Sequence, residues 1–498
     1  MDPVAGRDEA TAAGRALPPL VIDLDGTLVK TDLLLETVLA MLRKQPLFVL
    51  ALPFWLLRGK AYLKHQVARR SFLDIATLPW RTELIAYLIQ EKAEGRQLIL
   101  ATGGDVRLAE QVAAHLGLFH LVLATENGVN FAGETKRKEL VVRFGEQGFD
   151  YVAAGDADDI AVWRSARKAI LTSSDGVRQR AAARVTQVEQ AFAEHEPEFL
   201  EYIEALRPVH WLKNLLVLVP GFLVYRLQDS ASLRHAVGAF VSFCFCASAG
   251  YLLNDLADLE ADRHHPEKRL RSLAAGKLPL TYALLMIPLL LLTGGIAGMA
   301  ISPVFAAILL SYFVATTIYS FYLKKLVLVD VLLLASLYTL RIVAGAAAMG
   351  MWPSRWLVAF SMFLFFSLAL VKRYGELVIM RQRDGSGAKA RAYELSDSEL
   401  LAAMGIASGY LAVLVFALHI AIDAPRLQYW RSEPLWLLCP LLLYWISHVW
   451  LVAHRGKMPG DPLVFAVTDL PSRIVLFVLV LLALLATHPI SSLYGGAA

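Results

Sequence analysis

The chain has 498 residues, enough for two or three domains, and 57% of them are apolar, which is high for a soluble protein and predicts a membrane domain. The formal net charge of +4 hides an uneven layout of the basic residues and so says little about nucleic acid, but we find no nucleic-acid motif and expect no nucleic-acid partner. Cys244, Cys246 and Cys439 lie in apolar runs without a CxxC pair, which indicates packed thiols in a reducing compartment. Residues 1–18 have no apolar core, so we expect a tail that starts in the cytoplasm.

Candidate catalytic residues follow several of the predicted strands in the first half of the chain. The apolar strand at 20–22 runs into Asp23 and Asp25 and then a glycine turn, which places both carboxylates where open α/β sheets bind ligands. One carboxylate can attack phosphorus and the other can protonate the leaving oxygen, with Mg²⁺ neutralising the phosphoryl charge. Thr102 ends a second strand, Lys136 follows in a polar turn, and acids at 156–159 follow a third strand.

These elements, in this order, resemble the haloacid-dehalogenase (HAD) phosphohydrolase superfamily over residues 19–175, with DLDGT as the first motif. The resemblance implies an α/β fold with a Rossmann-like parallel sheet and a helical cap at about 30–95. It implies Asp23 as nucleophile, Asp25 as general acid/base, Thr102 and Lys136 as phosphate holders, and Asp23, Asp25, Asp156 and Asp159 as supports of one Mg²⁺. The acids at 156–159 are closer together than in the family's GDxxxD, so the choice between Asp158 and Asp159 stays open, as does the alternative of an inactive relic.

An apolar segment lies inside the expected cap. Residues 46–57 are apolar all round, include a Trp, have basic residues on both sides and are too short to span a bilayer. This pattern is typical of a contact with the membrane interface, which would make the phosphatase substrate a lipid phosphate. A cap that packs on its own core is an equal alternative. Residues 176–206 have helical spacing and predict a linker helix.

The second half, 207–498, predicts an all-α polytopic bundle. Nine apolar runs of about membrane-spanning length recur at about 212–227, 233–253, 281–301, 303–323, 327–349, 354–371, 401–422, 434–453 and 473–490. With a cytoplasmic start, the loops at 254–280, 324–326, 372–400 and 454–472 face the cytoplasm and hold most of the Lys and Arg of this half, in agreement with the positive-inside rule. We therefore expect a multi-pass protein of the inner (plasma) membrane with its first domain in the cytoplasm.

Three acids in the first of these loops stand out. Asp255, Asp258 and Asp262 have the spacing of one helical face, directly after an apolar run and with Asn254 beside them. Such carboxylates would repel one another unless a divalent cation lies between them, and charges near the bilayer are costly. The pattern predicts a Mg²⁺ site for a diphosphate, and the basic residues that follow suit its phosphates.

Other polar residues collect at the same expected face. Asp330 and Arg341 at membrane depth are candidates for binding residues, about three helical turns apart. Further candidates for substrate binding are Arg207, Lys213, Asn214, Lys268, Arg269, Tyr319, Lys324, Lys372, Arg373 and Glu376.

The motif NDxxDxxxD at 254–262, the nine runs and a YxxxLK segment at 319–324 resemble the UbiA family of intramembrane prenyltransferases, over about 200–490. Members that act on aromatic rings have a second Asp-rich motif after the sixth span, and here Lys-Arg-Tyr-Gly-Glu at 372–376 stands in its place. With RPxxWxKN at 207–214, this resembles the decaprenyl-phosphate phosphoribosyltransferase branch. That branch implies phosphoribosyl pyrophosphate and a polyprenyl phosphate as substrates and Mg²⁺ at the membrane site.

The two resemblances together predict transfer of 5-phosphoribose to the lipid phosphate, followed by removal of the 5-phosphate by the HAD-like domain. Two rivals stay open: prenyl transfer from a prenyl diphosphate to an aromatic acceptor, and a membrane-anchored phosphatase whose bundle has no activity. A homo-oligomer is compatible with the sequence, which decides neither the oligomeric state nor the polyprenyl length.

Overall fold

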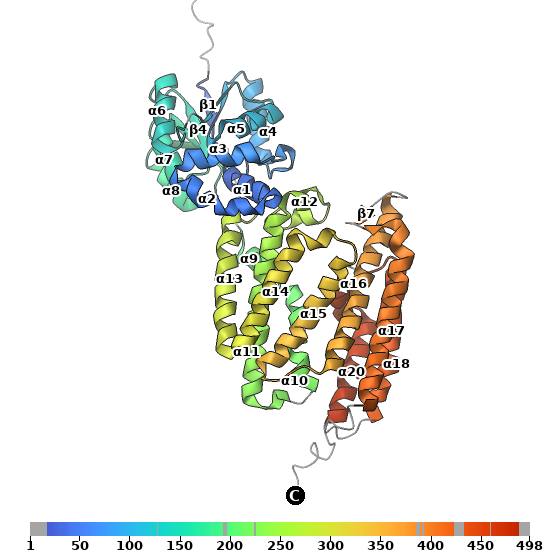
Figure 1. Ribbon diagram of the computed structural model, residues 1–498. Helices are drawn as coiled ribbons and strands as arrows, with labels where there is room; N and C mark the ends of the chain where they lie inside the picture. The colour runs from blue at the N-terminus through green and yellow to red at the C-terminus, as the bar shows by residue number, and fades with distance from the viewer. Residues whose placement is uncertain are drawn as a thin grey trace, which may run out of the picture. The chain divides into compact units, whose positions relative to one another are not determined.

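The computed structural model describes residues 17–126, 128–192, 197–223, 226–384, 389–390, 393–422, 433–458 and 460–487 (Figure 1). Most of the expected N-terminal tail therefore lies outside the described residues. The contacts divide the chain into two units. The first comprises Met1–Ala205 together with Asp255–Ala283, and the second comprises Leu206–Asn254 together with Leu284–Ala498.

A six-stranded parallel sheet forms the centre of the first unit, as the sequence predicted (Figure 1). The strand order is β3-β2-β1-β4-β5-β6, so the chain returns past β1 to build the other half of the sheet. The strands are β1 Leu20–Ile22, β2 Leu98–Asp105, β3 Leu121–Thr125, β4 Asp150–Ala153, β5 Lys168–Leu171 and β6 Gln187–Ala191. All neighbouring pairs are parallel.

Both faces of the sheet are buried at its central strands β1, β4 and β5, whereas the edge strand β6 is largely exposed. Leu20 and Ile22 pack in one apolar cluster, whereas Val21 between them packs in another. Alternate side chains of a strand point to opposite faces, so an uninterrupted apolar run gives two covered faces. The helices within residues 17–205 are α1 Leu33–Lys44, α2 Leu52–Leu57, α3 Lys60–Arg70, α4 Thr82–Ala93, α5 Val106–Leu116, α6 Gly133–Phe144, α7 Ala157–Trp163, α8 Gly176–Ala183 and α9 Phe199–Ala205, with 3-10 turns η1 Pro46–Leu50 and η2 Ile75–Thr77.

The stretch 176–206 differs from the expected linker helix. It contains α8, strand β6 and α9. Strand β6 pairs with β5, from Lys168 opposite Gln187 to Leu171 opposite Ala191, so the sheet extends beyond residue 175. Helical spacing in this polar stretch was a poor guide because strand pairing, a long-range contact, overrides local propensity.

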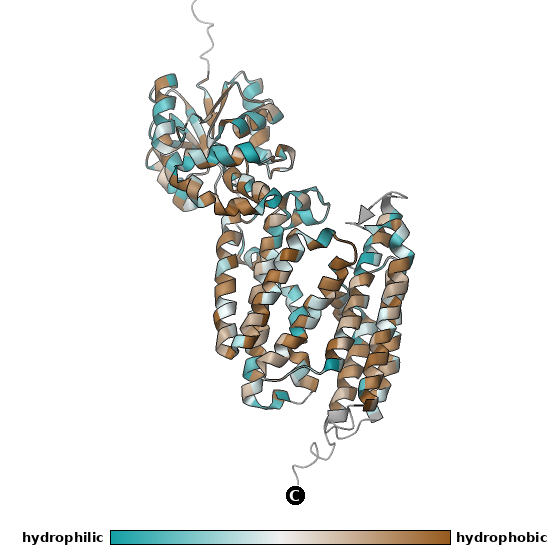
Figure 2. Ribbon diagram, viewed as in Figure 1, coloured by the Kyte–Doolittle hydropathy of each residue, from teal (hydrophilic) through white to brown (hydrophobic). Residues whose placement is uncertain are grey.

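The second unit is a helix bundle with hydrophobic residues along its helices (Figure 2). Among the described residues, seven helices are long and apolar enough to cross a membrane. These spans are Ser230–Ala257, Leu280–Ile301, Pro303–Phe321, Val329–Ala348, Arg355–Gln382, Leu395–Ile422 and Pro434–His454. They correspond to α11 Ser230–Ala257, α13 Leu280–Ile301, α14 Pro303–Phe321, α15 Val329–Ala348, α16 Arg355–Asp384, α17 Ser398–Ile422 and α18 Leu438–His454.

The nine expected spans are not confirmed, because the first and the last differ. The run at 212–227 falls in a short apolar segment, Pro208–Leu223, made of the 3-10 helix η3 Pro208–Leu218 and α10 Val219–Leu223. The last run falls on α20 Leu470–Thr487, which follows α19 Pro462–Thr468 at a bend of 85°, and residues 488–490 of this run lie outside the described residues. Asp469 lies at this bend and accepts a hydrogen bond from Ser472 N at 2.9 Å, so it caps α20 as a new helix.

Candidate functional sites

The acids that follow β1 meet a lysine from α6. Asp23 Oδ1 accepts a hydrogen bond from Lys136 Nζ at 2.7 Å. The same ammonium group donates to Tyr151 Oη at 3.0 Å, and this hydroxyl donates to Asp159 Oδ1 at 3.0 Å. All four side chains are buried. The structure therefore joins the predicted residues Asp23, Lys136 and Asp159 in one hydrogen-bonded chain.

The acids of this site bind protons more tightly than free carboxylates do. Burial raises the pKa of Asp25 to about 7, with the charges of Asp32 and Asp23 adding to the effect. Burial and the charge of Asp23 likewise raise the pKa of Asp159 to about 7. Burial acts to lower the pKa of Lys136, but the neighbouring carboxylates outweigh it and raise this pKa. Crowded carboxylates around one ammonium group favour a further cation.

Helix α3 brings a second lysine to the same edge of the sheet. Lys64 Nζ donates to Gly103 O at 2.6 Å and to Asn130 Oδ1 at 2.8 Å. Its charge also acts on Asp25, whose Oδ1 accepts a hydrogen bond from Leu33 N at 2.7 Å. Thr102 immediately precedes Gly103 and is fully buried.

The geometry separates the two acids between which the sequence could not choose. Asp159 is buried and accepts hydrogen bonds from Gly155 N at 2.9 Å and Asp156 N at 3.1 Å. Asp156 caps α7 in return, by accepting from Asp159 N. Asp158 is exposed. Asp159 is thus the acid that reaches Asp23 through Tyr151 and Lys136, which favours it over Asp158.

The acidic stretch of the first membrane loop is not one helix. Helix α11 ends at Ala257, and Asp258 is the N-cap of the short helix α12 Leu259–His264. The expectation of one continuous helical face is therefore wrong, because the chain turns at Asp258. Asp255 and Asp262 nevertheless converge, since Arg271 Nη1 lies 3.2 Å from Asp255 Oδ1 and 2.5 Å from Asp262 Oδ2.

This convergence fits a divalent cation. Both carboxylates are buried and turn an oxygen toward a single guanidinium nitrogen. Two carboxylates around one positive atom are the kind of oxygen donors that Mg²⁺ takes from proteins, together with substrate phosphates and water. Asp255 and Asp262 are the residues that would hold such an ion. Asp258, the N-cap of α12, does not form with them a group of three acids whose oxygens all lie within 4.8 Å of one another in the described part of the chain.

The stretch 255–283 contacts α1 through two ion pairs of different burial. Arg263 Nη2 lies 2.5 Å from Glu36 Oε1, and both side chains are at most 5% exposed. Arg263 directly follows Asp262 in the chain. Arg43 Nη1 lies 3.1 Å from Glu260 Oε2, and these side chains are 41% and 36% exposed. Only the first pair is shielded from water.

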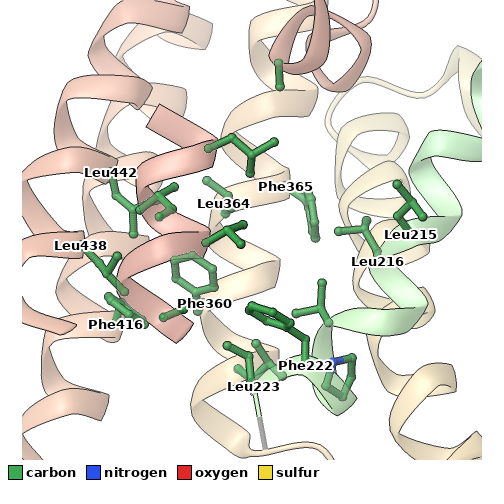
Figure 3. A pocket seen from close by; sticks show the side chains of 18 of the residues that line it. Leu215, Leu216, Phe222, Leu223, Phe360, Leu364, Phe365, Phe416, Leu438 and Leu442 are labelled. Carbon is green, nitrogen blue, oxygen red and sulfur yellow. The ribbon is translucent and has the colours of Figure 1, made fainter. Parts of the chain in front are cut away.

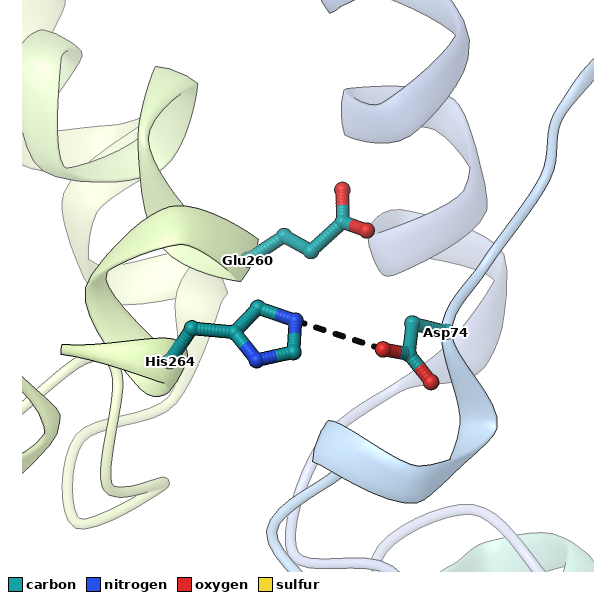
Figure 4. Close-up of side chains that lie close together, drawn as sticks. All are labelled: Asp74, Glu260 and His264. Atoms are coloured by element: carbon teal, nitrogen blue, oxygen red, sulfur yellow. Dashed lines mark ion pairs between the residues drawn. The ribbon is translucent and has the colours of Figure 1, made fainter. Parts of the chain in front are cut away.

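A third polar group in this stretch is formed by Asp74, Glu260 and His264, which turn their ends toward one another (Figure 4). His264 Nε2 lies 3.3 Å from Asp74 Oδ2. Glu260 is already paired with Arg43, and His264 is exposed. The group has the arrangement of surface ion pairs, and the histidines were not among the predicted site residues.

In the second unit, Lys213 pairs with an acid that the sequence did not single out. Lys213 of η3 forms an ion pair with Asp461, which caps α19. The positive charges of Lys213 and Lys372 both stabilise this carboxylate. Lys213 Nζ also lies 5.9 Å from the centre of the Tyr338 ring. Two of the predicted phosphate-binding lysines therefore share one acid.

Arg373 is enclosed in a network of its own. Its Nε lies 2.6 Å from Asp330 Oδ2, its Nη1 lies 2.8 Å from Glu376 Oε2, and its Nη2 donates to Tyr319 Oη at 3.1 Å. Arg373 and Asp330 are fully buried, and Tyr393 Oη donates to Asp330. The structure thus brings together four predicted binding residues, but the guanidinium of Arg373 is already neutralised by two carboxylates.

Arg341 belongs to a different contact from Asp330. Its Nε donates to Asn214 Oδ1 at 3.0 Å and its Nη2 donates to Tyr312 Oη at 2.6 Å. Arg341 and Asn214 are both buried. Asp330 and Arg341 both lie on α15, but they belong to separate hydrogen-bond networks. Asp330 contacts Arg373 and Tyr393, whereas Arg341 contacts Asn214 and Tyr312.

The remaining predicted residues are spread over both units. Arg207 has a left-handed backbone (φ 55°), and its guanidinium lies 5.4 Å from the Tyr251 ring centre. Asn254 is half-buried near the end of α11. Lys268 and Arg269 lie on the turn η5 Lys268–Leu270 of the first unit, and Lys324 lies on the turn η6 Leu323–Lys325 of the second.

The second unit also encloses an apolar cavity of about 710 Å³ (Figure 3). Its wall comes from η3 and α10 and from helices α16 to α20, with Leu216, Phe222, Phe360 and Leu438 among the side chains that point into it. Of the described lining residues, Lys213 is the one Lys, Arg, Asp or Glu. A largely apolar cavity with one cation in its wall fits an apolar molecule with an anionic end.

The profile of the UbiA prenyltransferase family matches residues 214–467, about half of the chain. The chain belongs to the UbiA family. This confirms the resemblance found in the second half. The matched range contains the acidic stretch, the Arg373 network and Asp461.

Three relatives of this UbiA-family chain are informative. It is 34% identical to the uncharacterized protein y4nM of Sinorhizobium fredii over 457 residues, 91% of this chain and 87% of that protein. It is 36% identical to the nodulation protein NoeC of Azorhizobium caulinodans over 274 residues, 54% of this chain and 88% of that one. It is 37% identical to the decaprenyl-phosphate phosphoribosyltransferase of Corynebacterium glutamicum over 193 residues, 38% of this chain and 57% of that enzyme.

Reasoning from the sequence missed several residues of these sites. Asp461 opens an apolar run as Asp330 does, so the same signal could have found it. Lys64 and Arg271 were noted only as basic residues near other features, and nothing in the local sequence marks Glu36 or Tyr151. The partners of these four residues are distant in the chain or set by loop geometry, which no local pattern encodes.

Proposed function

We propose that this UbiA-family chain transfers 5-phosphoribose from phosphoribosyl pyrophosphate to a polyprenyl phosphate at the cytoplasmic membrane face, and that its first domain then removes the 5-phosphate. The observation that carries the proposal is the convergence of the buried Asp255 and Asp262 on one cation. The choice of a ribosyl donor draws on the likeness to the phosphoribosyltransferase of Corynebacterium glutamicum.

In the transfer step, Asp255 and Asp262 would hold a Mg²⁺ ion, which would stabilise the charge of the pyrophosphate leaving group. An oxygen of the lipid phosphate forms the new bond to the anomeric carbon as the bond to pyrophosphate breaks. The attacking phosphate is already anionic, so no general base is needed and the residues act by positioning and charge stabilisation. Lys213 and Lys372 are the cations proposed to hold substrate phosphates.

The apolar cavity is proposed to receive part of the polyprenyl chain. Its walls offer Leu, Phe and Trp side chains, and Lys213 supplies a positive charge for the lipid phosphate. The lysine is paired with Asp461, so binding an anion there would require the acid to share its cation. We place Arg373 outside the phosphate-binding set, because Asp330 and Glu376 already surround it.

The second step is proposed for a HAD-type phosphatase site in the first unit. Asp23 would attack the phosphorus of the 5-phosphate, and Asp25 would protonate the ribose oxygen as the P–O bond breaks. The pKa of Asp25, raised to about 7 by burial, leaves about half of these carboxyls protonated near neutral pH, so that Asp25 can donate a proton. Water then releases phosphate from Asp23, with Lys64, Thr102 and Lys136 about the phosphoryl group. Asp156 and Asp159 would support the Mg²⁺.

The proposal is tested with full-length protein in lipid, radiolabelled phosphoribosyl pyrophosphate and polyprenyl phosphate. We expect the wild type to give polyprenylphosphoryl ribose and pyrophosphate. Asp23→Asn should accumulate the lipid that still carries the 5-phosphate, and Asp255→Asn should form no ribosylated lipid.

The controls separate the rivals. Glu260→Gln changes an exposed acid in the same loop and should keep both products. If no pyrophosphate is released from the ribosyl donor but a prenyl diphosphate is consumed, the result favours prenyl transfer to an aromatic acceptor over ribosyl transfer. If Asp255→Asn leaves all products unchanged, the bundle is an anchor. If Asp23→Asn still yields the dephosphorylated lipid, the phosphatase step is wrong.

A further inference from the structure

One apolar segment of the first unit is not used by either proposed reaction. It consists of η1 (Pro46–Leu50) and α2 (Leu52–Leu57), here called the apolar cap segment, and none of the residues of these two elements is buried. Leu47 and Leu57 are 81% and 85% exposed, and Leu50 and Phe54 are each 69% exposed. The alternative of a cap packed on its own core therefore fails for these side chains.

Along the sequence, the charged residues that flank this segment are all basic, and in the structure one of them, Arg43, pairs with Glu260. Between Glu36 and Asp74 the sequence contains no acid. In the same interval it contains Arg43, Lys44, Arg58, Lys60, Lys64, Arg69 and Arg70. The guanidinium of Arg70 lies 5.1 Å from the ring centre of Trp55, a residue of this segment. Surfaces that bind anionic lipid typically combine exposed aliphatic side chains, cations and a Trp, as this segment does.

We propose that the apolar cap segment inserts into the interface of an anionic lipid membrane. The described part of the same chain contains seven membrane-capable helices, which would tether the first unit to a bilayer. A second copy of the chain is a poorer partner, since two identical surfaces facing each other would bring their cations together. An anionic headgroup layer pairs with these cations while the acyl region receives the leucines.

The segment is linked directly to the proposed phosphatase site. Helix α2 packs against α3, and α3 carries Lys64, which contacts Gly103 and Asn130 at the edge of the sheet. A cap held at the headgroup layer keeps this site next to phosphates carried by lipids. This second part rests on the proposed function, because it names the substrate class of the same site as a lipid-linked phosphomonoester.

The membrane contact is tested by fluorescence, which needs no activity. A probe is attached at Leu57→Cys in full-length Cys439→Ser protein, since Cys244 and Cys246 are buried. The matched control is Val142→Cys on α6, an apolar residue of the same unit that is 80% exposed. In nanodiscs containing phosphatidylglycerol, spin-labelled lipid should quench the probe at 57 and not the probe at 142.

Each outcome of the quenching experiment either supports or overturns the proposed contact between the apolar cap segment and the membrane. Equal quenching at the two positions, or none at 57, overturns it. A probe at 57 that is shielded from water but not quenched by lipid means that protein covers the segment, and this also overturns the proposal. Weaker quenching at 57 in discs of phosphatidylcholine alone supports the role of the cations.

The substrate class is tested with Leu57→Asp. Phosphate release from the lipid-linked substrate should fall several-fold, whereas hydrolysis of water-soluble p-nitrophenyl phosphate should stay at the wild-type rate. An equal loss on both substrates, or on neither, overturns the lipid preference. A wild-type protein inactive on both would overturn the proposed phosphatase and the lipid preference with it, but not the membrane contact, which the quenching decides separately.

Discussion

Lys64 of α3 places its ammonium group at the edge of the sheet where Asp25 lies. It contacts the carbonyl of Gly103 and the amide of Asn130, and its charge reaches Asp25. Burial lowers the pKa of Lys64, while the charge of Asp25 opposes this. A lysine held in this way can bind a substrate phosphate at little further cost in side-chain entropy.

Lys64→Ala should lower kcat/KM for phosphate release about tenfold, the loss expected for one hydrogen bond to a charged group. Lys138→Ala removes an exposed lysine of α6 and should leave the rate unchanged. Steady-state release of phosphate from p-nitrophenyl phosphate measures both. Equal rates for the two variants would remove Lys64 from the site.

At the scale of elements, α1 and the stretch 255–283 are joined by one buried and one exposed ion pair. The buried pair, Glu36 with Arg263, is next to Asp262 in sequence, and Arg263 also donates to Ala274 O at 3.0 Å. Removal of one partner of a buried pair leaves an uncompensated charge out of water, which costs far more than the pair itself contributes.

Glu36→Gln should therefore destabilise the first unit by about 3 kcal/mol. Glu260→Gln breaks the exposed pair between the same two elements and should cost less than about 1 kcal/mol. Thermal unfolding of the full chain in detergent, followed by intrinsic fluorescence, compares the two variants. A midpoint that falls equally for both would show that Arg263 finds water or another partner when Glu36 is changed.

At the scale of the whole molecule, one chain carries two proposed sites that act in sequence. A common tether gives the product of the first site a high effective concentration at the second, into the millimolar range for short linkers. The long match to the Sinorhizobium protein, 457 residues, cannot be contained in either half of the chain, so that relative shares parts of both.

Asp23→Asn and Asp255→Asn chains, reconstituted together in one vesicle, should complement each other. Each variant keeps the site that the other lacks, so the dephosphorylated lipid should form, but at least about tenfold more slowly than with the wild type because the tether is lost. Chromatography of the labelled lipids follows both species over time. Formation at the wild-type rate would mean that the tether has no kinetic effect.

The sequence by itself determined the family of the second half, the parallel sheet of the first, and seven of the nine expected spans. These features rest on short-range patterns: apolar periods, strand-end acids and the NDxxDxxxD spacing. The first span failed because prolines and 3-10 geometry shorten it. The ninth falls on α20, which follows α19 at a bend of 85°, and its last residues, 488–490, lie outside the described part of the chain.

Only the tertiary structure decided which charged residues stay available for a ligand. The sequence predicted Arg373 and Arg341 as substrate-binding residues, yet folding encloses them among Asp330, Glu376, Asn214 and Tyr312. Conversely, Asp255 and Asp262 meet at Arg271 in spite of the broken helix. The physical reason is that an ionic group is neutralised by whatever packing brings within a few ångströms, and packing partners are set by the whole fold rather than by spacing along the chain.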